Sequence, residues 1–539
     1  MSFYSLTYKS FVIDSYFCYK HFLMRKQFLL HISLAMLLIV LNSCISIKKY
    51  NAHIEKEIVP ELLKDDADFA YTKLQKLHPH LYDYIAKEQL DYKFDSLKQT
   101  ITKPLKPNDF YLKLAPVIGE VRQGHLQLRP LSKKLTKKEQ KKLEAQKGLF
   151  SQFNYYVEDD KIYIKNNPEN LHNLKPGTEI LEVNGTSAKD LIKKYLPLMV
   201  SDGYNTTYHN YALARRWATL YTIDHGYLDS ANLKTKYGEE LKNVTLKRVY
   251  KTKKEKKEEK KDKKDTEEKR TRDYNPQTKS FNRVLHFYDK EHDIAHVKIK
   301  TFSGTKSRKF YRETFKKINE KGSDYLILDV RDNLGGSLAE IHNLYSYLSN
   351  EKRFRLINDI EVSSRTSMIH ADYFTNFPKF IKPVAAIFYP FYYFTSAFAV
   401  KKKNEKFILR GSQLVYPKKP KKNAFTGKIF VLVNGSSFSA SSTLASKLKF
   451  EKRAKIIGEE TGGANDATVA GQYSTEKLPN SKLQLPIGLM YIEPKITPDK
   501  KMHGVFPQVE IIPSLEQVVK KDDVQLKKVI EEIKSSKIQ

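Results

Sequence analysis

The chain has 539 residues, more than one hydrophobic core normally holds, so its length predicts at least three structural units. Its formal net charge of +33 is typical of nucleic-acid-binding proteins, but the lysines are spread along the chain and no nucleic-acid motif is present. The composition therefore favours a basic surface that faces anionic envelope lipids or lipopolysaccharide, with a simple effect on solubility as the alternative.

The N-terminus has the pattern of a secretory signal. A basic start at residues 24–26 precedes an apolar run at 28–40, which is shorter than a transmembrane helix normally requires. The Leu-Asn-Ser-Cys segment at 41–44 resembles a bacterial lipobox, which implies cleavage before Cys44 and lipidation of its thiol. Residues 1–44 are therefore predicted to be a signal region that leads to a lipid anchor.

The chain contains two cysteines, Cys18 and Cys44. Cleavage before Cys44 removes Cys18, so the mature chain is expected to have no disulfide and to depend on core burial alone. Translation starts at Met1 or at Met24, and Met24 gives the better signal segment. No Cys or His grouping has the spacing of metal ligands, and we expect neither a metal nor a cofactor.

Residues 54–147 are predicted to form a helical domain. Apolar residues recur there at helical spacing: Ala67, Ala70, Leu74 and Leu77, then Leu90, Phe94 and Leu97, then Phe110, Leu114 and Val117. Within this region Gly124 and His125 begin an alternating run that is typical of a strand. Taken alone, a histidine at this position is more often a structural residue than a base.

Residues 148–250 contain the pattern Lys-Pro-Gly-x-x-Ile-Leu-x-Val-Asn-Gly at 175–185, between strand-like segments and a helix expected at 188–196. The pattern resembles a PDZ domain, a module that binds peptide C-termini by adding an extended strand to a sheet edge. A packing domain without a ligand is the alternative. The following residues, 251–273, have mixed charge without apolar anchors and are predicted to be an exposed linker.

Residues 274–513 alternate between strand-like and helical patterns, which predicts an α/β layer structure. The expected elements are strands within 284–302, a helix at 307–321, a strand at 325–330, a helix at 338–349, a strand at 428–433 and a helix at 443–450. An aromatic, lysine-rich segment at 369–416 interrupts this order. It is predicted to be a substrate-contacting lid, a membrane-facing patch or ordinary buried core. Residues 514–539 are expected to form one amphipathic helix that begins with a capping box.

Two motifs in this region carry residues that suit acyl transfer. Ser439 stands where the strand at 428–433 passes into a helix, so a nearby base could activate its hydroxyl, and free backbone N–H groups at the helix start could stabilise an oxyanion. Gly335 and Gly336 follow the strand at 325–330, and paired glycines let the backbone approach a ligand closely. Each motif alone is more often a helix cap or a tight turn.

Together, the Gly-His motif at 124–125, the Gly-Gly turn at 335–336, the serine segment at 434–441 and the Gly-Glu-Glu-Thr-Gly-Gly segment at 458–463 resemble the tail-specific (C-terminal processing) serine peptidase family. The resemblance covers the order of all four motifs and spans roughly residues 60 to 510. It implies an α/β multidomain fold: a helical N-terminal region, a PDZ-like module and a crotonase-like β/α catalytic core.

The resemblance also implies roles for individual residues. Ser439 matches the nucleophile, and Ala440 matches the residue whose backbone N–H helps to form the oxyanion hole. Gly335 and Gly336 match the glycines that complete this hole, and the backbone N–H of either one could be the donor. One branch of the family uses a lysine base, whose expected position here is Ala464, so the serine–lysine dyad is missing.

The other branch, which includes tricorn-like peptidases, takes its base from the Gly-His motif, which assigns His125 as the general base. A neutral imidazole can accept a serine proton at neutral pH. In that branch a glutamate and a polar residue beside the histidine help to orient the site, but Gly124 precedes the histidine here. Glu459, Glu460 and Gln123 remain candidates for the orienting residue, and spacing does not choose among them.

The sequence thus predicts a serine peptidase that is lipid-anchored in the bacterial cell envelope, on the periplasmic face or in the outer membrane. Its substrates are expected to be proteins or peptides, cleaved through an acyl-enzyme on Ser439, and no nucleic-acid partner is expected. An inactive relative that binds peptides or apolar ligands is one alternative, and a basic surface adaptor is another. The substrate, the cleavage preference and the oligomeric state are left open.

Overall fold

The computed structural model describes most of the chain after the expected signal region, namely residues 47–167, 169–251, 273–275, 280–288, 293–304, 306–374, 377–378 and 381–538. The predicted lipobox with Cys44, and residues 252–272 of the predicted charged linker, lie outside the described residues. None of the helices in these ranges is long and apolar enough to cross a membrane.

The chain divides into two compact units. In the smaller one, helix α2 (Ile47–Glu55) contacts the segment 132–140, which leads into helix α6 (Lys137–Glu144). Asn51 exchanges two hydrogen bonds with the Lys134 backbone, of 2.8 and 2.9 Å, and the Lys134 ammonium lies 4.0 Å from the Tyr50 ring centroid. The larger unit contains residues 57–131 and everything after residue 140.

The helical domain in the larger unit is built from α3 (Pro60–Leu77), α4 (Lys87–Gln99) and α5 (Pro107–Gly119). Proline stands at the start of α3 and of α5, where its missing N–H needs no partner. All the apolar residues predicted for this region are buried except Val117, whose place in the core is taken by the next residue, Ile118.

The prediction of a strand that begins at His125 is wrong. His125 lies in a turn, and the extended residues after it make only one isolated bridge, between Arg129 and Gln484. Leu126 and Leu128 are both buried, so the alternation reflects burial of one side of an extended segment and not membership of a sheet. The strand that it approaches, β20 (Gln484–Ile492), is already paired along its length with β19 (Thr468–Lys477).

The predicted PDZ-like region folds around a sheet in the order β2-β3-β4-β6-β7, with β5 paired to β4. Helix α8 packs along the edge strand β2, and α7 packs near β4. The elements are β2 (Asn154–Glu158), β3 (Lys161–Asn166), β4 (Glu179–Val183), β5 (Thr186–Ser187), α7 (Ala188–Tyr195), α8 (Thr207–His225), β6 (Ser230–Tyr237) and β7 (Glu240–Lys247).

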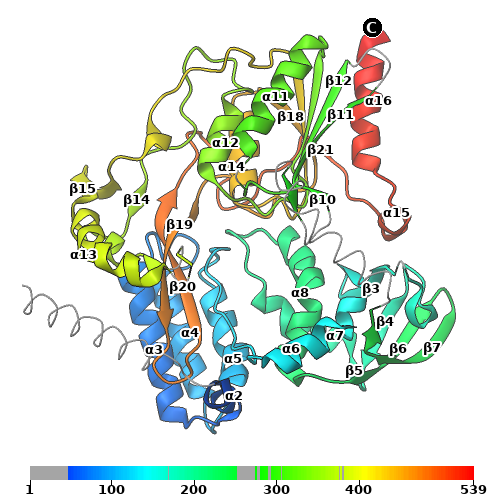
Figure 1. Ribbon diagram of the computed structural model, residues 1–539, viewed down its shortest axis with the longest axis vertical. Coiled ribbons are helices and arrows are strands. Elements are labelled where there is room, and N and C mark those ends of the chain that lie inside the picture. Colours follow the sequence, from blue (N-terminus) through cyan, green and yellow to red (C-terminus); the bar gives the residue numbers. More distant parts are fainter. Residues whose placement is uncertain are drawn as a thin grey trace, which may run out of the picture. The chain divides into compact units, whose positions relative to one another are not determined.

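The C-terminal half contains a six-stranded sheet in the order β11-β12-β13-β17-β18-β21, parallel except for β11. Helices α11, α12 and α14 cover one face and α16 covers the other, which confirms the predicted α/β layers (Figure 1). The elements are β11 (Arg283–Tyr288), β12 (Ile294–Ile299), α11 (Ser307–Glu320), β13 (Tyr325–Asp329), α12 (Leu338–Tyr345), β17 (Lys428–Val433), α14 (Ala440–Phe450), β18 (Ala454–Gly458), β21 (Val509–Glu510) and α16 (Val524–Ile538).

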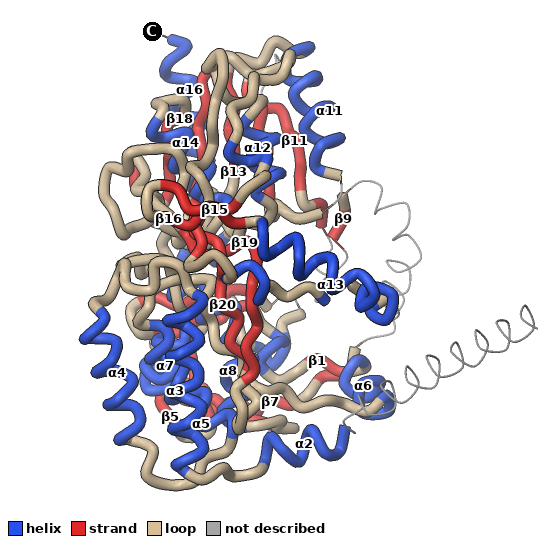
Figure 2. The backbone as a smooth tube through the Cα atoms, turned by 90° about the vertical axis from the view of Figure 1, so that its left-hand side faces the viewer, coloured by secondary structure: helices blue, strands red, loops and turns tan. Residues whose placement is uncertain are grey.

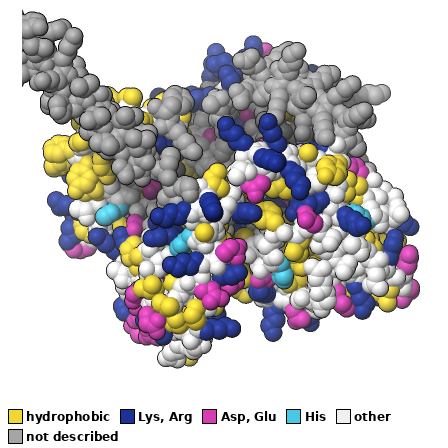
Figure 3. Space-filling view, turned by 60° about the horizontal axis from the view of Figure 1, so that its bottom comes forward, with side chains coloured by type: hydrophobic (Ala, Val, Ile, Leu, Met, Phe, Trp, Pro, Cys, Tyr) yellow, Lys and Arg dark blue, Asp and Glu magenta, His cyan; other side chains and the backbone are white. Residues whose placement is uncertain are grey.

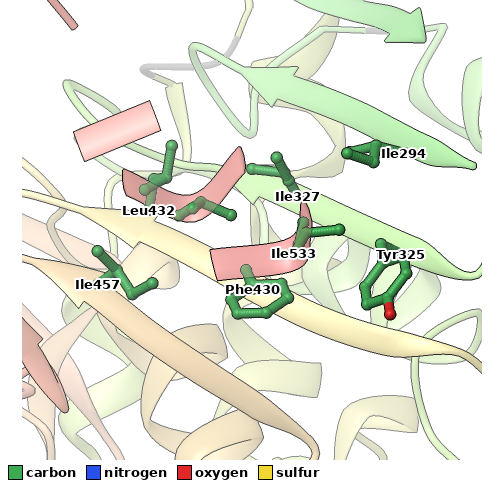
Figure 4. Close-up of a cluster of buried hydrophobic side chains, with 8 residues drawn as sticks. Ile294, Tyr325, Ile327, Phe430, Leu432, Ile457 and Ile533 are labelled. Carbon is green, nitrogen blue, oxygen red and sulfur yellow. The ribbon is translucent and has the colours of Figure 1, made fainter. Parts of the chain in front are cut away.

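The face under α16 forms a continuous apolar core (Figure 4). Val529 and Ile533 of the helix meet Ile327, Leu432 and other residues of the central strands, and both helix residues are fully buried. The single helix predicted for residues 514–539 is instead two helices, α15 (Leu515–Lys520) and α16, because Lys521 adopts a left-handed conformation with φ +57°. The predicted capping box at Ser514 and Gln517 is confirmed.

A third sheet, in the order β15-β16-β14-β20-β19, contains the long hairpin of β19 and β20, which reaches down beside α3 (Figure 1). Its strands are β14 (Glu361–Val362), β15 (Val400–Lys403), β16 (Lys406–Leu409), β19 (Thr468–Lys477) and β20 (Gln484–Ile492). Short strand pairs complete the structure: β1 (Gln146–Lys147) with β8 (Val249–Tyr250), and β9 (Tyr274–Asn275) with β10 (Ser280–Phe281).

The aromatic segment predicted within 369–416 forms helix α13 (Lys382–Phe398), which lies on the outside of this third sheet (Figure 2). Only two of its residues, Ala385 and Ser396, are buried. Ordinary core burial, one of the three interpretations of this segment, is therefore wrong.

Candidate active site

The turns that carry Ser439 and the glycine pair meet because their strands are neighbours. β13 and β17 are parallel and paired, so both chains leave the sheet at the same edge. Asn434 joins the two turns by accepting a hydrogen bond from the Asp332 N–H (3.0 Å) and donating one to the Asp332 carboxylate (3.1 Å). The Asn333 carbonyl in turn accepts from the N–H of Phe438 (3.0 Å).

Ser439 is half-buried and occupies the N-cap of α14 with φ +55° and ψ −117°. A residue with a side chain rarely adopts this conformation, which costs free energy and is concentrated at functional sites. The hydroxyl of Ser439 has no hydrogen-bond partner among the described residues. The backbone thus holds a free hydroxyl at the start of a helix.

Gly335 lies directly against this serine. A Cβ atom on Gly335 would be 2.8 Å from the Ser439 Cβ and 2.9 Å from the Ala440 nitrogen, so only glycine fits there. Its own N–H already donates to Asn333 Oδ1 at 2.9 Å. The N–H groups of Gly336 and Ala440, in contrast, have no partner within the described part of the chain, so of the three predicted oxyanion donors these two are available.

His125 has its two ring nitrogens in different environments. Nδ1 lies 3.2 Å from the Tyr473 hydroxyl, whereas Nε2 is buried without a hydrogen-bond partner among the described residues. Burial lowers the pKa of His125 to about 4, so the ring is neutral at pH 7. If Nδ1 carries the proton and donates it to Tyr473, Nε2 has a free lone pair.

Phe438, the residue before Ser439, packs against His125. The two rings meet edge to face with centroids 5.5 Å apart, and the Phe438 ring also lies 4.9 Å from that of Tyr208. A Cβ on Gly124 would be 2.2 Å from Phe438 Cζ, which explains a glycine beside the histidine. The structure therefore brings the serine turn to the histidine, but no hydrogen bond joins Ser439 and His125.

A buried carboxylate, Asp202, links the loops on both sides of this contact. It accepts hydrogen bonds from the N–H of Gly124 (2.7 Å) and of Ala464 (3.3 Å), and its burial raises its pKa to about 7. Ala464 follows Gly463, where a Cβ would be 2.6 Å from the Ser439 nitrogen. Asp202 thus ties the turn of His125 to the loop that supports the serine.

The three predicted orienting residues lie elsewhere. Glu459 accepts a hydrogen bond from the Tyr211 hydroxyl (2.7 Å), Glu460 lies 3.4 Å from His503, and Gln123 accepts from the Val469 N–H (3.4 Å). None of these contacts involves His125. Tyr473 and Asp202, which do support the histidine turn, belong to no motif that the sequence displays.

Two cavities approach the site. The larger, about 720 Å³, is a groove between strand β2 and helix α8 that ends at Asp332, Leu334 and Glu459. The smaller, about 330 Å³, is lined by His125, Phe438 and again Leu334. Leu334, which is 46% exposed, borders both cavities.

Helix α8 connects the groove wall to the serine turn. Arg215 Nη1 donates to Ser436 Oγ at 2.6 Å, the Tyr211 hydroxyl donates to Glu459, and the Tyr208 ring packs at a tilt against Phe438. The N-terminal end of the helix also reaches the loop after β18, since Thr207 Oγ1 donates to the Glu460 carbonyl at 2.9 Å. One helix therefore lines the groove and contacts the candidate nucleophile loop.

Comparison with known proteins identifies the domain that carries Ser439. Residues 293–511 match the model of peptidase family S41. This part of the chain is a peptidase family S41 domain. The match confirms the predicted resemblance to tail-specific peptidases, and a protein or peptide substrate follows from membership of this family. No curated protein matches the chain in sequence.

Solved structures extend the likeness of fold beyond this domain. The structure of mature CPAF complexed with lactacystin has a TM-score of 0.58 at 15% identity, covering 89% of this chain and 98% of that one. Mature CPAF has a TM-score of 0.53 at 15% identity, with 86% and 99% covered. The photosystem II D1 C-terminal processing protease has a TM-score of 0.39 at 14% identity, with 86% and 98% covered.

Proposed function

We propose that the chain is a serine peptidase that cleaves peptide bonds through an acyl-enzyme on Ser439, with His125 as general base. The observation that carries this proposal is the conformation of Ser439: a strained, half-buried residue with a free hydroxyl, next to the free N–H of Ala440. Its position within a peptidase family S41 domain agrees with this role.

In the proposed reaction, the Ser439 Oγ attacks the carbonyl carbon of the scissile peptide while His125 Nε2 takes the hydroxyl proton. The N–H groups of Ala440 and Gly336 receive the negative oxygen of the tetrahedral intermediate. His125 returns the proton to the leaving amine. Water then attacks the acyl ester, its proton passes through His125, and Ser439 is regenerated.

This sequence of steps requires Phe438 to turn away from His125, because its ring packs against the imidazole in the present structure. The ring of Tyr208 on α8 also packs against Phe438. The edge strand β2 and α8 form a groove in which a peptide can add as an extended strand, as in PDZ domains. We propose that the substrate enters along this groove and passes Leu334 toward Ser439.

A second candidate function is peptide binding without cleavage. The contact of Phe438 with His125 and the lack of a Ser439–His125 hydrogen bond in the described structure favour it. In that case the groove binds peptides and the serine turn is a structural remnant.

The experiment that separates the two is turnover of an unfolded protein substrate by the Ser439→Ala variant. We expect turnover to fall by about a thousandfold or more with the melting temperature unchanged, because the small hydroxyl makes no contact that stabilises the fold. Ser441→Ala is the matched control. Its hydroxyl donates to the Asn333 carbonyl at 2.8 Å, so that variant should lose about 1 kcal/mol of stability but keep activity. Equal turnover by Ser439→Ala and the wild type would exclude the proposed nucleophile.

A further inference from the structure

Helix α13 is held to the rest of its unit along one side only. The Tyr373 hydroxyl donates to the Ala385 carbonyl at 3.1 Å, and its ring packs against Tyr389 and Tyr392 at centroid distances of 5.5 and 4.5 Å. Ala385 and Ser396 are the buried residues of the helix. This side fixes the orientation of the helix on the third sheet.

The opposite side presents an exposed apolar stripe that no described part of the chain covers, which we call the aromatic face. Its members recur at intervals of three and four residues, so they align along one side of the helix. Their exposed fractions lie between 54% and 71%: Val384, Ile387, Phe388, Phe391, Phe394 and Phe398. A contiguous exposed patch of this kind marks an interaction site in a soluble domain.

The chain around the aromatic face is strongly basic. Between residues 373 and 427 the sequence has eleven lysines and arginines and a single carboxylate, Glu405. Lys401, Lys402 and Lys403 follow the helix directly on β15, and all three are exposed. On the face of the molecule shown in Figure 3, Lys and Arg side chains are interspersed with Asp and Glu.

Some of these lysines have local partners. Lys402 pairs with Glu405 at 2.6 Å, and Lys403 pairs with Asp359 at 3.1 Å. Such exposed pairs contribute little free energy and can be exchanged for other anions. Lys401 makes no ion pair with any residue that the structure describes, so its full charge is available to a partner.

We propose that the aromatic face of α13 docks into an anionic lipid membrane. A helix with phenylalanines on one side and lysines beside it has the composition of an interfacial helix, which lies in the membrane plane with its apolar side among the acyl chains. The lysines of β15 then face the lipid phosphates. Residues 373–427 contain no acidic residue other than Glu405. An apolar protein partner would leave the positive charges of this segment uncompensated, so an anionic surface is favoured.

The test is cosedimentation of the full chain with vesicles of phosphatidylcholine and phosphatidylglycerol, compared with vesicles of phosphatidylcholine alone. We expect the wild type to bind the anionic vesicles and to be released by salt. The double variant Phe391→Ser with Phe394→Ser should bind at least about tenfold more weakly for each ring removed. Lys401→Gln should weaken binding about fivefold, and only to the anionic vesicles.

The matched control is the double variant Tyr92→Ser with Leu241→Ser, which removes two equally exposed apolar side chains from other elements and should bind like the wild type. All variants share the N-terminal segment, so its own membrane affinity cancels in the comparison. Circular dichroism verifies that each variant is folded.

A second measurement locates the contact. A polarity-sensitive dye on Thr395→Cys, in a chain with Cys18→Ser and Cys44→Ser, should shift to shorter wavelength with anionic vesicles, whereas the same dye on Tyr92→Cys should not. The proposal is overturned if the phenylalanine variant binds as tightly as the wild type or the dye at position 395 does not respond. A different result would also overturn it: the wild type does not bind vesicles, and light scattering without vesicles shows that it is an oligomer whereas the phenylalanine variant is a monomer. The aromatic face would then join two copies of the chain.

Discussion

At the scale of single residues, the environment of His125 decides which chemistry the site can support. Its Nδ1 meets the Tyr473 hydroxyl, Nε2 is free, and burial keeps the ring neutral. A base that is neutral well below pH 7 is ready to accept a proton, but no carboxylate among the residues that the structure describes hydrogen-bonds to the ring of His125 to stabilise the imidazolium. Asp202 acts on the ring only through the backbone of Gly124.

The pH dependence of activity follows from this burial. Because the pKa of His125 is lowered to about 4, we expect kcat/KM for a peptide substrate to stay nearly constant from pH 7 down to about 5 and to halve near pH 4. An exposed histidine base would give the half-point near 6.5, and a lysine base would place it well above neutrality. Either of those results would remove His125 from the proposed role.

A stability control belongs to this experiment. The folded-state pKa of His125 lies below its unfolded value, so the unfolded chain takes up the proton first as the pH falls. The His125 contribution to stability is therefore present above about pH 6.5 and is lost between about 6.5 and 4. Far-UV circular dichroism at each pH separates loss of fold from protonation of the base.

At the scale of elements, the site depends on three turns that no single strand or helix explains. The turns after β13 and β17 meet because their strands are paired, and the turn of His125 is added through Asp202 and Phe438. At this junction a Cβ on Gly124 would overlap the Phe438 ring, 2.2 Å from its Cζ atom.

A double-mutant cycle tests that junction. Gly124→Ala should destabilise the chain by about 1–3 kcal/mol, because its Cβ overlaps the Phe438 ring. In a Phe438→Leu background the same change should cost at least about 0.5 kcal/mol less, since the ring is gone. Unfolding midpoints in urea give all four free energies. Strictly additive effects would show that the ring does not pack against Gly124 in solution.

The parts of the candidate site that could be predicted from the sequence are those that depend on local chain pattern. Ser439, the glycine pair and the α/β layers could be predicted because strand, turn and helix follow one another directly. Tyr473 could not, since it meets His125 from 348 positions away with no motif around it. The prediction of a strand after His125 was wrong for a similar reason. The sequence of residues 125–128 does not indicate that β20 is already paired with β19.

At the scale of the whole molecule, the groove leads to the candidate site, and two contacts with membrane are proposed. α8 joins the groove to the serine turn within one unit. The proposed contacts, the aromatic face of α13 and a lipid on Cys44, lie at distant positions in the chain and would differ in strength. A peripheral helix is released by salt, whereas multiple acyl chains are effectively permanent.

The lipid anchor is tested by mass spectrometry of the native N-terminus. We expect a chain that begins at Cys44 and carries acyl chains, because residues 41–44 resemble a lipobox. The wild type should stay with membranes after a high-salt wash, and Cys44→Ser should yield an uncleaved precursor or a form that the wash releases. An unmodified Cys44 within an uncleaved chain would contradict the anchor and the envelope location.

The most direct test of the central claim is labelling of the full chain with a fluorophosphonate, which reacts with a serine only where a base and an oxyanion hole are assembled. Peptide mapping should find one probe per chain, on Ser439. The His125→Ala variant should label at least about a hundredfold more slowly, because the general base is lost. A wild type that does not react, or that reacts at Ser439 equally fast without His125, would contradict the proposed mechanism.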